Sequence, residues 1–216
     1  MHAGMVRACV YLSLVLLLGF SLWEPVDGRR TRYKPKPKPT SATKPVEEIP
    51  PAPKVRIDEI SGQWYLLSMA SRCKYLMEHG YKAEGTIIKL NVPSSQKDPI
   101  EVSTLTKLNF QCWEIKQKYQ KTNIPGRFLL KANLPAKNTD VTIVDTDYSS
   151  YIILLYKKLG KSSLKLYGRS PKISDDIVDK FEDIARKQGL GLETVFQFPI
   201  YGFCQSVDKD HTLVMA

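Results

Sequence analysis

The sequence predicts an all-β protein, an eight-stranded antiparallel up-and-down barrel with one C-terminal α-helix packed on the outside and a short ninth strand. Two patterns after residue 54 predict this fold. Short segments with alternating apolar residues follow one another, separated by turn signals such as Pro93-Ser94-Ser95 and Gly160. One later segment has apolar residues at helical spacing instead. The composition, 43% hydrophobic and 25% charged over 216 residues, is globular and excludes collagen-like and coiled-coil chains.

Eight segments form the expected barrel. In chain order they are residues 63–70, 84–92, 100–108, 110–119, 127–132, 140–146, 151–157 and 163–169. Eight short strands at this spacing are typical of an antiparallel sandwich or an up-and-down barrel. The run YIILLY at 151–156 is apolar on both faces, which predicts that the helix covers it.

The segment after the eighth strand is predicted to be a helix. It begins after Ser174, a favourable N-cap residue, and ends before Gly189. Ile177, Phe181 and Ile184 fall on one face at helical spacing, so this face should pack on the sheet. A last short strand is expected at 194–198.

Alternation along 110–119 and 127–132 separates the two faces of the barrel wall. Five side chains fall on the apolar, inward face, where they are expected to line the barrel interior: Trp113, Ile115, Tyr119, Phe128 and Leu130. The bore of an eight-stranded barrel suffices for packed side chains or for one small ligand. The alternation does not distinguish an interior filled by side chains from a hollow one.

Residues 1–28 have the pattern of a secretory signal peptide. Arg7 precedes an apolar run from 8 to 23, and Val26 and Gly28 supply the small residues of a cleavage site. The run is shorter than the ~20 residues that a membrane-spanning helix needs. Because 1–28 hold one basic and two acidic residues, their removal raises the formal net charge from +10 to +11. We therefore expect a secreted, extracellular protein.

A basic arm rich in proline and lysine is expected at 29–54, with eight basic and two acidic side chains. It has too few apolar residues to offset the entropy of ordering, so we expect disorder. Such an arm suits either a solvated tail or contact with an acidic surface. The barrel domain then extends from 55 to 216, long enough to bury a core.

Signal cleavage removes Cys9 and leaves an odd number of cysteines, Cys73, Cys112 and Cys204, in an oxidising compartment. Cys112 shares a strand face with charged residues and should point outward, where Cys204, just after the last strand, can meet it. Cys73 lies in a polar loop between two basic residues, which favour the reactive thiolate. We predict an internal bridge between Cys112 and Cys204 and an intermolecular bond through Cys73.

Patterns for catalysis and metal binding are missing from the sequence. Only His79 and His211 remain after signal cleavage, and neither has the spacing of a metal ligand or of a nucleophile's partner. A Gly-rich phosphate loop and an Asn-linked glycosylation motif are also absent. We expect no catalytic residue, no metal, no cofactor and no nucleic-acid partner.

Three short motifs, in order along the chain, resemble the signature of the lipocalins. They are Gly62-Gln63-Trp64 at the start of the first strand, Thr146-Asp147-Tyr148 after the sixth, and Arg169 at the end of the eighth. The resemblance covers about residues 57–208. It implies the lipocalin barrel, or calyx, with Arg169 packed across Trp64 at the closed end in a cation–π contact.

Longer segments at 73–84, 126–132, 144–148, 165–170 and 198–204 are similar to the lipocalins of the complement system. This resemblance implies a disulfide through Cys73 to the alpha chain of the eighth complement component, with the beta chain in the same complex. It also implies the Cys112–Cys204 pair, a cavity that receives a segment of the alpha chain, and a place in membrane attack complex assembly.

Two other classes of lipocalin function are alternatives. One is a free extracellular carrier of a small hydrophobic ligand, a retinoid or similar, and members of this type also have a cysteine in the same loop. The other is a lipocalin enzyme of the prostaglandin synthase type, which needs a nucleophilic cysteine on the second strand. Residues 84–92 contain no cysteine, which argues strongly against the enzyme.

Overall fold

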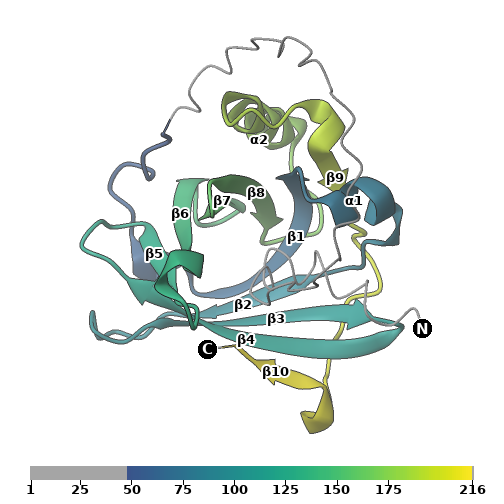
Figure 1. Cartoon of the computed structure of the whole chain (residues 1–216), viewed down its shortest axis with the longest axis horizontal. Helices are drawn as coiled ribbons and strands as arrows, with labels where there is room; N and C mark the ends of the chain where they lie inside the picture. The colour runs from purple at the N-terminus through teal and green to yellow at the C-terminus, as the bar shows by residue number, and fades with distance from the viewer. Residues whose placement is uncertain (1–47, 216) are drawn as a thin grey trace, which may run out of the picture.

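The computed structural model describes residues 48–215, and eight of the strands in this range close into an antiparallel barrel (Figure 1). In order they are β1 (Gly62–Ser71), β2 (Ile87–Asn91), β3 (Ile100–Leu108), β4 (Gln111–Lys121), β5 (Arg127–Leu130), β6 (Thr139–Thr146), β7 (Tyr151–Lys158) and β8 (Lys161–Gly168). Each strand pairs with the next in sequence, and β8 returns to pair with β1. The predicted up-and-down barrel is confirmed.

Two short strands complete edges that the barrel leaves unpaired. Because β2 has five residues and β5 has four, part of β1 and part of β4 extend beyond them. The expected β9 (Val195–Gln197) pairs with β1 at 68–70. The strand β10 (Thr212–Val214), which we did not predict, pairs in parallel with β4 at 114–116 and lies beside it in Figure 1. Both additions satisfy backbone groups that would otherwise form an open edge.

The long helix α2 (Asp175–Lys187) packs on the outer face of the barrel, as predicted (Figure 1). Its C-terminus is closed by Gly189 at φ +70°, after which the Leu190 N–H donates to the carbonyl of Ala185 at 2.9 Å. An ion pair of 3.0 Å between Lys180 and Asp145 of β6 adds to the docking. The burial of Phe181 and Ala185 provides the apolar contact.

Two hydrophobic cores lie on the two sides of one wall. In β7, Ile152, Leu154 and Tyr156 face the barrel interior, whereas Ile153 and Leu155 face α2. This division explains why the run at 151–156 is apolar at every position. Both faces of this strand are covered.

Shorter helices close the two ends. The 3-10 helix η2 (Ile57–Ile60) precedes β1 at one end. At the other end, the helix α1 (Lys74–His79) and the 3-10 helix η3 (Gly80–Lys82) occupy the segment expected to be a polar loop, so that expectation was wrong in its secondary structure. Three further 3-10 turns are η4 (Pro135–Lys137), η5 (Leu192–Thr194) and η6 (Lys209–His211).

The last residues of the arm that we expected at 29–54 pack on the barrel. The part of the chain that packs on the barrel therefore begins before residue 55, where we had placed the start of the barrel domain. The Ala52 N–H donates to the carbonyl of Ile143 at 2.9 Å, and Glu48 forms a 2.9 Å ion pair with Arg127. The signal peptide and the rest of the arm lie outside the described residues. Within 48–215, no helix has the length and apolar character needed to cross a membrane.

Candidate functional site

The closed end of the barrel is built around Trp64 and Arg169. The Trp64 side chain is fully buried, and its Nε1–H donates to the carbonyl of Ile60 at 2.9 Å. The Arg169 guanidinium lies 3.6 Å from the Trp64 ring centroid and donates to three backbone carbonyls, of Glu59, Gln63 and Tyr148. Since these contacts use its donors within the fold, Arg169 stabilises this end.

The segment 146–148 forms the turn between β6 and β7. The Thr146 hydroxyl donates to the carbonyl of Tyr151 at 2.7 Å and accepts the N–H of Tyr148 at 2.9 Å. Partial burial acts to raise the pKa of Asp147, but hydrogen bonds from the N–H groups of Tyr151 and Ser150 outweigh it and lower the pKa. Tyr148 has φ +67°, so this turn holds a strained residue in place. The hydrogen bonds of these residues hold the turn between β6 and β7 in place.

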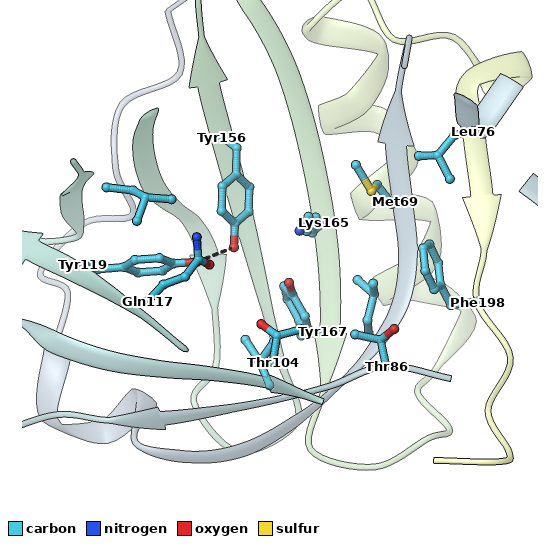
Figure 2. Close-up of a pocket in the computed structure, with 13 residues that line it drawn as sticks. Met69, Leu76, Thr86, Thr104, Gln117, Tyr119, Tyr156, Lys165, Tyr167 and Phe198 are labelled. Atoms are coloured by element: carbon cyan, nitrogen blue, oxygen red, sulfur yellow. Dashed lines mark hydrogen bonds between the residues drawn. The ribbon is translucent and has the colours of Figure 1, made fainter. Parts of the chain in front are cut away.

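A cavity lies inside the barrel toward the opposite, open end (Figure 2). Thirteen residues line it: Leu66, Met69, Leu76, Thr86, Ile88, Thr104, Gln117, Tyr119, Leu130, Tyr156, Lys165, Tyr167 and Phe198. Its free volume is about 30 Å³. This is space for on the order of one or two water molecules, whereas a pocket for a small organic ligand has roughly 300–1,000 Å³. The interior is therefore filled by side chains except at its centre.

The structure separates the five side chains that were expected to line the cavity. Tyr119 and Leu130 line it. Trp113 and Ile115 are on the same face of β4 but pack in a separate cluster with Leu108, Leu213 and Met215, because the unpredicted β10 brings the C-terminal segment over them. Phe128 is buried in the barrel core and does not reach the cavity. Of the five side chains, these three therefore do not line the cavity.

Three phenols converge on the cavity from facing walls. The hydroxyls of Tyr119 and Tyr156 are 3.1 Å apart, as the dashed line in Figure 2 shows. Burial raises the pKa of Tyr119, Tyr156 and Tyr167 above the ordinary value of 10. These side chains thus stay neutral and can donate hydrogen bonds at physiological pH.

Lys165 is the charged residue of the cavity wall, and sequence reasoning missed it. It is only 9% exposed, and its Nζ lies 4.6 Å from the centroid of the Tyr156 ring. Burial lowers the pKa of Lys165 from 10.5 to about 8. The alternation along β8 could have indicated the position of Lys165. Because Leu164 and Leu166 face the helix, Lys165 between them points into the barrel.

Replacing Lys165 by methionine is expected to change how stability depends on pH. Because the folded-state pKa of about 8 lies below the unfolded value of 10.5, the unfolded chain binds more protons between these limits. The buried charge therefore costs on the order of 3 kcal/mol below pH 8, and stability rises as pH increases above 8. Lys165→Met should be more stable at pH 7 and lack the rise.

Urea denaturation of both proteins between pH 7 and 9.5 measures this difference. Above about pH 10 the raised pKa values of the buried tyrosines act oppositely, because the unfolded phenols lose protons first. Lys161→Met, on the exposed end of the same strand, is the matched control. An identical rise in wild type and Lys165→Met would contradict the prediction.

A lid of short elements covers the cavity at the open end. Leu76 of α1 is buried and lines the cavity together with Phe198, which follows β9. Cys73 is half-buried at the N-cap position of α1, and its backbone N–H donates to the Ser71 hydroxyl oxygen at 3.2 Å. Cys73 therefore lies directly before the helix that closes the barrel.

On the outside of the barrel, Cys112 and Cys204 form a disulfide with their Cα atoms 5.7 Å apart. Cys204 is buried against Ile87 and Leu105. The bridge holds the segment after β9 on the wall made by β2, β3 and β4. Within 48–215, no three His, Cys, Asp or Glu side chains gather in a way that could hold a metal ion.

Comparison with known proteins identifies the family. The profile of the lipocalin / cytosolic fatty-acid binding protein family matches residues 61–200, from the start of β1 to beyond β9. The chain is a lipocalin. The matched residues include Trp64, Arg169, the eight barrel strands and α2.

Three relatives are similar to this lipocalin over most of its length. It is 35% identical to the complement component C8 gamma chain of Oryctolagus cuniculus over 176 residues, 82% of this chain and 86% of the relative. It is 30% identical to Protein AMBP of Mus musculus over 156 residues, 70% of this chain but only 44% of AMBP. A lipocalin of Rhinella marina is 28% identical over 74% of this chain and 88% of its own length.

A solved structure of the siderocalin Ex-FABP has the same fold. It superposes with a TM-score of 0.58 at 23% identity and covers 67% of this chain and 96% of its own. This likeness concerns the barrel and its helix alone.

Proposed function

We propose that this lipocalin is a secreted, non-catalytic subunit of the eighth complement component. In this proposal Cys73 is disulfide-bonded to the alpha chain, the beta chain belongs to the same complex, and the complex takes part in assembly of the membrane attack complex. The open end of the barrel receives a segment of the alpha chain. The similarity to a C8 gamma chain over most of both sequences supports it.

The position of Cys73 carries the proposal. A partner bonded to this residue is held at the first turn of α1, beside the side chains that close the cavity. Because the cavity itself is small, an entering segment has to displace Leu76 and its helix. A tether at this helix raises the effective concentration of the segment at the open end of the barrel.

A free carrier of a small hydrophobic molecule is the second candidate, supported by the match to the lipocalin / cytosolic fatty-acid binding protein family over residues 61–200. The cavity volume of about 30 Å³ argues against a resident retinoid-sized ligand. Extraction of the secreted protein with organic solvent and mass spectrometry tests this candidate directly.

Partner binding by two variants tests the proposed function. Cys73→Ser should lose the covalent product on a non-reducing gel but still bind purified alpha chain, because a tether does not by itself select a partner. Leu130→Lys places a charge at the cavity wall and should weaken the association at least about tenfold with Cys73 intact, because its desolvation is uncompensated.

Leu129→Lys is the matched control, because Leu129 is on the opposite face of the same strand. Circular dichroism must show that each variant folds. If Cys73→Ser loses all binding while Leu130→Lys binds normally, the bond alone carries the association. If the wild type migrates as a free monomer on both reducing and non-reducing gels, the subunit proposal fails.

A further inference from the structure

Lys165 is a buried ammonium that faces the cavity without an acidic partner. Figure 2 shows it between Tyr156 and Met69, with Tyr119 and Gln117 on the wall to one side. No hydrogen bond or ion pair joins its Nζ to any described residue, and the Nζ lies over the Tyr156 ring. A buried charge of this kind is costly unless something pairs with it.

The remaining cavity wall provides hydrogen-bond donors and apolar surface but no negative charge. The titratable groups that face Lys165 are the phenols of Tyr119 on β4, Tyr156 on β7 and Tyr167 on β8. The other elements that line the cavity contribute apolar side chains or hydroxyls, and β4 also contributes the side-chain amide of Gln117. The site is thus positive, rich in donors and otherwise apolar.

We propose that the barrel interior is a carboxylate site, in which the group that enters through the open end pairs its carboxylate with Lys165 Nζ. The phenols and Gln117 complete the hydrogen bonds of the carboxylate, and its apolar stem runs past Leu76 and Phe198 to the open end. If the carboxylate is an acidic side chain of the partner segment, the inference rests on the proposed function. A free fatty acid is the other source with the same chemistry.

The cavity volume is large enough for the carboxylate of the ligand but not for its apolar stem. About 30 Å³ accommodates a carboxylate-sized group in place of water, whereas the stem requires α1 to move. Since α1 has six residues and its N-cap residue makes no side-chain capping hydrogen bond, the helix has little stability of its own to oppose its displacement. Pairing at Lys165 and opening of the lid are therefore linked.

Titration calorimetry of the mature secreted protein with hexanoate and with 1-hexanol tests the site. At pH 7 we expect hexanoate to bind at least tenfold more tightly than the alcohol, and Lys165→Met to remove this preference. Lys161→Met should bind as the wild type does. At pH 8, where about half of the Lys165 amines are neutral, binding of the hexanoate anion should be coupled to the uptake of about half a proton by Lys165, measured in buffers of different ionisation enthalpy.

Purified alpha chain distinguishes the two sources. If the carboxylate belongs to the partner, Lys165→Met in the Cys73→Ser background should weaken alpha-chain binding at least tenfold. If hexanoate depends on Lys165 but alpha-chain binding does not, the carboxylate is that of a free fatty acid. If neither depends on Lys165, the site is overturned. Failure of the wild type to bind alpha chain contradicts the proposed function while the hexanoate measurements still decide the site.

Discussion

Removing the bridge between Cys112 and Cys204 is expected to lower the free energy of unfolding by about 4–5 kcal/mol. The bridge closes a loop with a sequence separation of 92, and chain entropy favours long closed loops most strongly. Without it, the unfolded chain gains conformations that the folded barrel does not. Strain in the native bridge would reduce this value.

The double variant Cys112→Ala/Cys204→Ala, measured by urea denaturation in a Cys73→Ser background, isolates the effect from disulfide exchange. Alanine is preferred to serine because Cys204 is 2% exposed and a hydroxyl there would be buried among Ile87 and Leu105. Reduction of the Cys73→Ser protein itself is the control and should give a similar loss. A loss below about 1 kcal/mol would contradict a role for the bridge in stability.

Trp64→Ala is expected to lower the free energy of unfolding by about 3–5 kcal/mol, the cost of removing a large buried aromatic side chain. The ring is 0% exposed at the closed end of the barrel, and its removal also leaves the carbonyl of Ile60 without its 2.9 Å hydrogen bond. No ligand contact is lost, because the cavity toward the open end does not include Trp64.

Arg169→Ala should cost less than Trp64→Ala. The cation–π contact contributes about 0.5–2 kcal/mol, and three partly exposed carbonyls lose a charged donor but regain water. Arg169→Lys, which keeps the charge but not the planar fork, should fall between Arg169→Ala and the wild type. Equal, small shifts of the unfolding midpoint for Trp64→Ala and Arg169→Ala would show that this end is not tightly packed.

Alternation and helical spacing predicted the barrel well because both report which side of an element is buried. The expected strand at 100–108 coincides with β3 from end to end, and the expected helix coincides with α2. Ile177 and Ile184 pack on the core around Phe181, as their spacing indicated. Such local periodicities need no knowledge of the partner strand.

The elements that sequence reasoning missed are too short to show a period. The helix α1 has six residues and β10 has three. Each forms because the barrel offers it an uncovered place, the open end for α1 and the free edge of β4 for β10. Their conformations are therefore set by contacts that are distant in sequence.

The sequence by itself determined the barrel, the outer helix and the residues that mark the lipocalin family. Only the tertiary structure decided that the interior is nearly filled, that Lys165 faces the remaining space, and that Trp113 and Ile115 pack apart from it. The physical reason is that alternation assigns a side chain to a face, whereas free volume depends on how side chains from several strands and the lid meet at the centre.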